Sequence, residues 1–334
     1  MRIRTQRSSG GVNVEYVIYL SKRILAIVIT ISAVIAVAYI LMHYSPGSFF
    51  SIASLESAMG NLQTTDPHLF QTYVKMFESR YGLNEPLWKQ VFQYVWHSLT
   101  FNFGTSFENP AVLIINQLKT AFPISAGLAI GSVILAIFVG VPLGIVAALK
   151  RNTWVDSLLV TLSVAGQAIP SFVLAVMLVL VFGVIFPGVI SVNGWGTPSD
   201  VVLPVICLAA GNIAQITRYM RSSLIDAMRQ EYIRTAESKG IGYWSVVWHH
   251  GIRNSLTALI TVVGPMFAFT IVNTVWVENV FSIPGLGTLL SSAFVADDIP
   301  LAITSVFILS LLVMGMNLLV DIAYRLLDPR VELD

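Results

Sequence analysis

The sequence predicts an all-α, polytopic membrane protein with about six membrane-spanning helices. Hydrophobic residues make up 55% of the 334 residues and charged residues only 11%, whereas soluble domains carry roughly 25% charged residues. The mean hydropathy is +0.76. About six separate apolar runs each approach the ~20 helical residues that cross the hydrocarbon core of a bilayer.

The composition also excludes several classes of protein. The net charge of +1, with no Lys/Arg-rich tract containing interleaved aromatic residues, gives no support for nucleic-acid binding. The single cysteine, Cys207, excludes an internal disulfide. The first apolar run is about 20 residues long, whereas the core of a cleavable signal has roughly 7–15 residues. We therefore expect this run to remain in the protein as a span.

The N-terminal third is predicted to contain one span and a long polar segment. Residues 1–21 carry three arginines and form an N-terminal segment, and residues 22–44 form the first span. Residues 45–118 mix polar and apolar residues without a run that could cross a membrane. Two amphipathic helices are expected within this segment, at about residues 68–80 and 87–99.

Residues 119–331 are predicted to form a core of five further spans. Pro170 lies inside the third span of the chain, where the loss of a backbone hydrogen bond should kink the helix. Residues 218–256, between the fourth and fifth spans, are too charged to lie in hydrocarbon. The five spans are expected at about residues 124–149, 158–186, 201–217, 257–280 and 301–327.

The distribution of Lys and Arg predicts the orientation. With the N-terminus inside, all but four of the 19 Lys and Arg residues lie on the cytoplasmic side. The positive-inside rule therefore predicts cytoplasmic N- and C-termini, a cytoplasmic 218–256 segment and an extracytoplasmic 45–118 segment. The four residues left outside are Lys75, Arg80, Lys89 and Lys119.

The 218–256 segment is predicted to form two short helices separated by Gly240 and Gly242. A helix, a glycine elbow and a second helix form a shape suited to docking, but a basic loop that touches anionic lipid would have a similar composition. Helical spacing predicts a first apolar face of Ile225, Met228, Tyr232 and Ala236, and a second of Trp244, Val247, Trp248 and Ile252.

Several of these residues resemble a known family. Arg221-Ser222-Ser223, the run EYIRTAESKG at 231–240 and Arg253-Asn254-Ser255-Leu256 resemble the EAA-type cytoplasmic loop of bacterial ABC-importer permeases, most closely the oligopeptide/dipeptide/nickel permease family. Further matches extend over about residues 22–331. They are Gly82 to Leu87, Gly104-Thr105-Ser106, Gly194-Trp195-Gly196, residues 277–287, Leu319-Val320-Asp321 and Leu327-Asp328-Pro329-Arg330.

The resemblance implies a type I ABC-importer permease fold, in which this loop docks onto an ATPase subunit. Ala236 and Gly240 would be the alanine and the elbow glycine of the loop motif. The implied partners are a second related permease subunit, two ATPase subunits that bind ATP and Mg, and an extracytoplasmic solute-binding protein. The candidate ATPase-coupling residues are Arg234, Thr235, Ala236, Glu237, Lys239, Gly240, Tyr243 and Trp244.

Polar residues within the spans are candidates for the transport pathway. Such side chains usually bridge helices, and some of them could line a pathway. Glu278 could face a gate or cap the turn that precedes Pro284-Gly285. His249 and His250 have no Cys or carboxylate at ligand spacing, so no metal site is predicted. The pathway candidates are Pro170, Gln167, Asn212, Gln215, Asn273 and Glu278.

No catalytic residue and no cofactor of this chain is predicted. The sequence has no Walker-type phosphate loop, no nucleophile elbow and no HExxH motif. Any energy from ATP must therefore come through another subunit.

The resemblance implies a permease subunit of the bacterial cytoplasmic membrane that forms half of a pathway for oligopeptides or dipeptides and works by alternating access. A permease for a nickel chelate or another small solute of the same family is an alternative. A stand-alone secondary transporter is a weaker one, because the middles of the spans lack the ionisable residues that ion coupling requires. An intramembrane enzyme would need paired acids or a Ser/His pair at membrane depth, and none is visible.

Overall fold

The structure, a computed structural model, describes residues 9–44, 60–82 and 85–327. The described residues are almost entirely helical and contain no strand, apart from an isolated bridge between Thr105 and Leu113. The chain divides into two compact units. The first comprises residues 1–115 and 293–314, and the second comprises residues 116–292 and 315–334.

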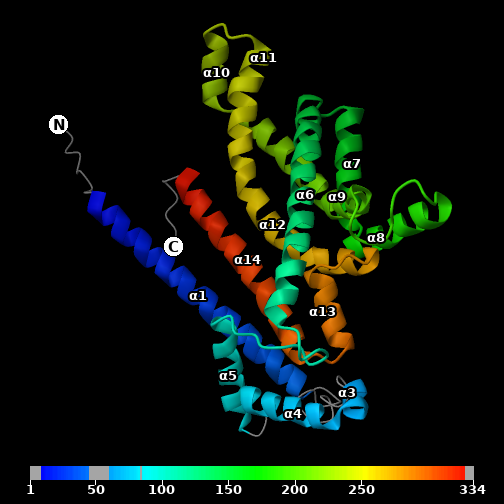
Figure 1. The fold of residues 1–334 in the computed structure, drawn as a ribbon. Helices are drawn as coiled ribbons and strands as arrows, with labels where there is room; N and C mark the ends of the chain where they lie inside the picture. Colours follow the sequence, from blue (N-terminus) through cyan, green and yellow to red (C-terminus); the bar gives the residue numbers. More distant parts are fainter. Residues whose placement is uncertain (1–8, 45–59, 83–84, 328–334) are drawn as a thin grey trace. The chain divides into compact units, whose positions relative to one another are not determined.

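The described residues contain four helices that are long and apolar enough to cross a membrane, or up to six if each of two bent helix pairs is one span. The predicted all-α polytopic class is therefore confirmed. The four helices are α1 (Ser9–His43), α6 (Ile114–Leu149), α9 (Pro198–Ala227) and α14 (Ile299–Leu327) (Figure 1).

The two bent pairs account for the remaining predicted spans. One consists of α7 (Trp154–Ala168) with α8 (Ser171–Leu180) and the π-helical turn η1 (Val181–Ile185). The other lies within residues 243–281, which include α12 (Arg253–Phe281) and bend by 50°.

The first unit contains α1, α3 (Gly60–Thr65), α4 (Pro67–Tyr81) and α5 (Leu87–Leu99). The bounds of α4 and α5 agree with the two predicted amphipathic helices. Asp66 caps α4 by accepting a 3.0 Å hydrogen bond from Leu69 N, and Gly82 ends the helix in the left-handed conformation at φ 63°. The helix α1 includes residues 9–21 of the predicted N-terminal segment.

A buried carboxylate holds together the loop before α6 and the start of α14. Asp298 is fully buried between α13 (Leu286–Val295) and α14. Its side chain accepts hydrogen bonds from Ser106 Oγ, Glu108 N at 3.3 Å and Leu301 N at 3.2 Å. Burial raises the pKa of the Asp298 carboxyl above its usual range, and these hydrogen bonds oppose that shift.

The second unit contains α6, α7, α8, α9 and α12, and its core includes a close contact between α6 and α9. Gly140 and Gly144 of α6 form a small-residue pair at i and i+4. A Cβ on Gly140 would lie 2.8 Å from the Ile216 side chain, and one on Gly144 would lie 2.7 Å from Thr217 O. Thr217 Oγ1 also donates a 3.3 Å hydrogen bond to Gly140 O. Glycine at both positions therefore allows the two backbones to approach closely.

The third predicted span is a broken helix pair and not one kinked helix. The axes of α7 and α8 differ by 95°. Ile169 at the break has extended backbone angles of φ −83° and ψ 117°. The residue before a proline is disfavoured in the helical conformation, so Pro170 ends α7 and begins α8.

Several helix ends also differ from the prediction. The helix α6 begins at Ile114, ten residues earlier than predicted, and contains Pro123 without a break. The helix α9 continues to Ala227, so the first ten residues of the predicted 218–256 loop belong to it. Met220, Leu224 and Ala227 are buried on one face of this extension, which explains its helical continuation.

Candidate functional site

The first candidate site is the charged segment, residues 228–252. It contains α10 (Glu231–Ser238), α11 (Tyr243–Val246) and a π-helical turn η2 (Val247–Ile252). Ile233, Ala236 and Val246 form a small buried cluster in which the two arms of the segment meet. The segment thus has a small apolar core of its own.

Gly240 forms the elbow between the two arms. Its N–H donates a 2.9 Å hydrogen bond to Glu237 O, and Ile241 N donates a 3.3 Å bond to Ala236 O. These two bonds define a Schellman motif, in which the residue at the position of Gly240 takes a left-handed conformation. The φ of Gly240 is +76°, and a Cβ there would meet no atom within 4 Å. The requirement for glycine is therefore conformational, and not a matter of space.

The charged segment presents aromatic and charged side chains outward. Tyr243 and Trp244 are 54% and 62% exposed, and their rings contact each other edge to face at 5.5 Å. Of the predicted coupling residues, Ala236 is buried in the core of the segment, whereas the others are exposed. The exposed ones are Arg234, Thr235, Glu237, Lys239, Gly240, Tyr243 and Trp244.

The two predicted apolar faces are wrong in detail. Ile225 belongs to α9, and the turn at residues 228–230 separates it from α10, so the first predicted face is not continuous. Ile233 and Ala236 are the buried residues of α10, and Tyr232 is exposed. In the second arm, Val247 and Ile252 are buried as predicted, but both tryptophans are exposed.

The second candidate site is a pair of adjoining cavities within the second unit. One has a volume of about 310 Å³ and the other about 500 Å³. Each is lined by residues of α7, α9 and α12, and they share Gln167, Gly211, Asn212 and Asn273. Pro170 lines the smaller cavity and Gln215 the larger one. Five of the six predicted pathway residues therefore come together here.

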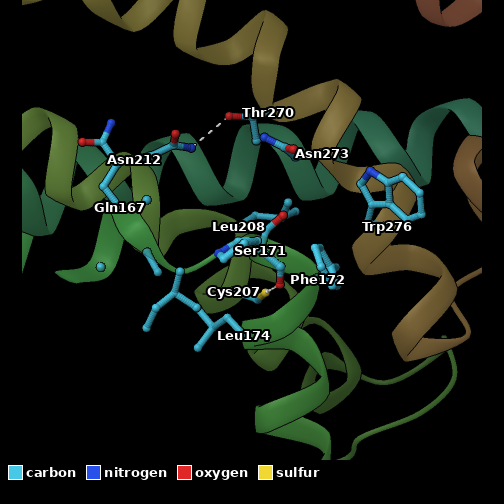
Figure 2. Close-up of a pocket in the computed structure, with 15 residues that line it drawn as sticks. Gln167, Ser171, Phe172, Leu174, Cys207, Leu208, Asn212, Thr270, Asn273 and Trp276 are labelled. Carbon is cyan, nitrogen blue, oxygen red and sulfur yellow. Dashed lines mark hydrogen bonds between the residues drawn. The ribbon is translucent and has the colours of Figure 1, made fainter. Parts of the chain in front are cut away.

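Neutral amide groups supply much of the polarity of these cavities. Asn212 Nδ2 donates a 2.9 Å hydrogen bond to Thr270 Oγ1, which joins α9 to α12 (Figure 2). Gln167 accepts a hydrogen bond from Arg218 of α9. Among the described residues, Gln215 and Asn273 have no hydrogen-bond partner for their side chains.

The break at Pro170 shapes the smaller cavity. Phe172 and Trp276 lie on its wall with ring centroids 6.4 Å apart (Figure 2). Cys207 Sγ donates a 3.1 Å hydrogen bond to Ser171 O at the start of α8. The wall therefore combines aromatic surface with neutral hydrogen-bonding groups, which is the usual character of a small-molecule site.

Glu278 lies elsewhere. It is fully buried, and its Oε2 accepts a 2.7 Å hydrogen bond from Gly287 N in the first turn of α13. A Cβ on Gly285 would lie 2.4 Å from the Glu278 carboxylate, so glycine leaves room for it. Glu278 lines neither cavity, and this geometry favours the turn-capping alternative.

An ion pair that sequence reasoning missed connects α7 to α9. Arg221 Nε and Nη2 donate hydrogen bonds of 2.5 and 2.7 Å to the two carboxylate oxygens of Asp156. Asn152 N donates a further 3.0 Å bond to Asp156. Asp156 is buried, and the Arg221 side chain is 25% exposed. No signal of this pairing is present in the sequence. Asp156 precedes an apolar run, Arg221 was assigned to the loop, and the two residues are far apart in the chain.

Among the described residues, no three His, Cys, Asp or Glu side chains are grouped so that they could hold a metal ion. His249 Nδ1 lies 3.1 Å from Ser245 O and 3.4 Å from Ser245 Oγ, both one turn earlier in the chain.

Comparison with known proteins decides the family. The sequence profile of the family described as "Binding-protein-dependent transport system inner membrane component" matches residues 140–333. The chain belongs to this family. The matched region includes both the charged segment and the two cavities of the inner membrane component. The resemblance inferred from the loop motif is thereby confirmed, and the chain is a multi-pass membrane protein.

Full-length relatives of this inner membrane component carry related names. The dipeptide transport system permease protein DppB of Bacillus subtilis is 34% identical over 321 residues, covering 94% of this chain and 98% of that protein. DppB of Lactococcus lactis is 32% identical over 318 residues, covering 94% and 99%. The oligopeptide transport system permease protein OppB of Haemophilus influenzae is 33% identical over 318 residues, also covering 94% and 99%.

Proposed function

We propose that this chain is the membrane-spanning permease subunit of an ATP-driven importer and forms half of a pathway for peptides. The observation that carries the proposal is the pair of amide-lined cavities among apolar helices. Side-chain amides offer both donors and acceptors without charge, as a peptide backbone does. The similarity to dipeptide and oligopeptide permeases over most of the chain supports the same substrate class.

Two observations support the proposed partners. The sequence has no Walker-type phosphate loop, and the charged segment has an exposed surface. Two ATPase subunits, which bind ATP and Mg, drive the cycle, and a second related permease subunit completes the pathway. An extracytoplasmic solute-binding protein delivers the peptide. Tyr243 and Trp244 are aromatic, exposed and held on a folded elbow, which suits them as anchors in a groove of the ATPase subunit.

In the proposed mechanism, movement of the ATPase subunits displaces the charged segment and changes which side of the membrane the cavities face. The segment continues directly from α9, which carries Asn212 and Gln215 into the cavities. Coupling of two sites requires an element with two discrete arrangements that both sites bias. We assign that role to α9 together with the charged segment. The proposed orientation places the charged segment and both termini in the cytoplasm.

The test is peptide uptake by the purified four-subunit complex in proteoliposomes with the binding protein present. Asn273→Ala should raise the KM for uptake by about 2–10-fold, because one hydrogen bond contributes roughly 0.5–1.5 kcal/mol. Asn317→Ala is the matched control, since Asn317 is also an exposed amide on an apolar helix but lines neither cavity.

The same assay separates the alternatives. Peptide uptake that a nickel chelate does not compete with supports the proposal. Chelate uptake without peptide uptake would assign the chain to the nickel branch of the family. Peptide uptake by the chain without any ATPase subunit would show a secondary transporter instead.

A further inference from the structure

The helix α5 has its polar and aromatic faces reversed relative to a helix on the surface of a soluble protein. Three aromatic residues follow one another at intervals of four and therefore lie on one face. These are Trp88, Phe92 and Trp96, which are 73%, 66% and 60% exposed. The buried residues of the helix are polar, namely Gln90, Tyr94 and Ser98. Aromatic residues facing outward and polar residues facing inward indicate that the surroundings of this face are not bulk water.

The position of α5 within the first unit identifies those surroundings. Tyr39 Oη, one turn before the end of α1, donates a 2.8 Å hydrogen bond to Gln90 Oε1. The rings of Tyr39 and Tyr94 are 5.4 Å apart. Tyr94 Oη in turn donates a 3.1 Å bond to Pro300 O, in the first turn of α14. The helix α5 is therefore fixed to the last turns of one apolar span and to the first turn of another.

The ends of apolar spans lie where the hydrocarbon core meets the headgroups. Tryptophan and other aromatic residues concentrate at that depth, because their rings are amphipathic. The last turns of α1 also expose Val37 and Leu41, so its lipid-facing surface continues toward the level of α5. Lys89 adjoins the aromatic stripe and pairs with Glu85 at 2.7 Å, which places a polar ion pair beside the aromatic face.

We propose that Trp88, Phe92 and Trp96 insert into the headgroup region of the lipid bilayer, so that α5 is an interfacial anchor. The ligand is the lipid surface itself, which an amphipathic helix binds through its apolar face. The anchor holds α5, which is fixed to α1 and α14, at a constant depth in the membrane. It makes no use of the cavities or the charged segment, and so it stands independently of the substrate.

The test uses nitroxide labels in a Cys207→Ser background, since Cys207 is the only cysteine of the chain. Single cysteines replace Trp88, Phe92 or Trp96, with Lys89→Cys as the matched control from the neighbouring face of the same helix. The assembled complex is reconstituted in vesicles of phosphatidylethanolamine and phosphatidylglycerol. Collision rates with oxygen, which enriches in lipid, and with a water-soluble nickel chelate are then measured by electron paramagnetic resonance.

The proposal predicts mobile labels with high oxygen and low nickel collision rates at positions 88, 92 and 96, and the reverse at position 89. Equal nickel collision rates at all four positions would show that the stripe faces water. Immobilised labels with low rates for both reagents would show that a protein subunit covers it. Collision rates at positions 88, 92 and 96 that change only when the solute-binding protein is added would show that these residues are a docking site for that protein. Each of these three results overturns the lipid assignment.

Discussion

At the scale of single residues, Gly240 offers the sharpest test of the charged segment. Its φ of +76° costs a residue with a Cβ about 1–2 kcal/mol, and more for a β-branched side chain. Gly240→Val should therefore open the elbow and reduce both retention of the ATPase subunits and ATP-driven uptake, while the spans stay folded. Co-purification of the ATPase subunits and uptake in proteoliposomes measure these effects.

Gly240→Asn is the matched control for this prediction. Asparagine tolerates the left-handed conformation, and the space around Gly240 is open, so this variant should behave nearly as the native chain does. If Gly240→Val and Trp244→Ala both retain normal assembly, hydrolysis and uptake, the segment is only a basic loop beside the lipid.

The Asp156–Arg221 pair makes a second prediction at this scale. Asp156→Ala leaves the Arg221 guanidinium without its partner, and the expected loss of unfolding free energy is about 3 kcal/mol, at the low end for buried pairs because Arg221 is partly exposed. The double variant Asp156→Asn with Arg221→Gln removes both charges and should recover most of the loss. Thermal unfolding of the purified complex reports both changes, and a double variant no more stable than Asp156→Ala would contradict the ion-pair interpretation.

Individual polar residues were predictable from the sequence when their surroundings were apolar. An amide such as Asn212 within an apolar run must find a partner or a cavity, and the run makes it conspicuous. Arg218 and Arg221 gave no such signal, because their charges were taken as evidence for a loop. A carboxylate from a distant part of the chain, Asp156, allows Arg221 to stay on a helix, and pairing over that separation is not visible in local patterns.

At the scale of elements, the break at Pro170 makes the next prediction. An alanine at this position restores a backbone N–H and permits the helical conformation at Ile169. Pro170→Ala should therefore reduce the 95° bend between α7 and α8, reshape the smaller cavity and lower uptake severalfold at equal expression. Uptake at normal rates would make the break structural only.

Pro142→Ala is the control for Pro170→Ala. Pro142 lies inside the continuous helix α6 and lines neither cavity. Its replacement should leave uptake unchanged, which would show that the effect at position 170 depends on the break and not on the loss of a proline.

The same comparison shows why element types were easier to predict than element ends. The bounds of α4 and α5 agree with prediction because turn residues and a helical period mark them. Pro123 and Pro170 carry the same local signal, yet α6 continues through the first and α7 ends before the second. A proline in the local sequence therefore does not by itself determine whether a helix ends.

At the scale of the whole molecule, the proposed orientation makes a direct prediction. In a Cys207→Ser background, a cysteine at Thr64 should react with an impermeant thiol reagent in intact cells, and one at Ser238 should react only after lysis. Both positions are exposed in the structure. A cysteine that does not react in intact cells would therefore lie on the side of the membrane that the reagent does not reach, and would not be buried within the protein. Labelling of Ser238 in intact cells would reverse the assignment of cytoplasmic termini.

The class of the whole molecule followed from the sequence because hydropathy is a property of long runs. The number of spans, by contrast, depends on whether a bent pair counts as one span, and the bends arise from local backbone geometry. Leu83-Asn84 and Asp328-Pro329-Arg330, which belong to the motif matches, lie outside the described residues. The family assignment rests on the sequence comparison, which does not depend on the structure there.

The close approach of α6 and α9 at Gly140 and Gly144 has a mechanical consequence. At these two successive turns the α6 backbone packs directly against the Ile216 and Met220 side chains and the Thr217 carbonyl of α9, so α6 contributes no side chain there that could change rotamer and absorb a displacement. The helix α9 has 30 residues, which corresponds to a rod of about 45 Å. A push applied at the Ala227 end of that rod would reach Asn212 with little loss, and it would carry α6 along. The two helices would then move together as one stiff lever. Bending of the second unit would take place at the breaks beside Pro170 and within residues 243–281.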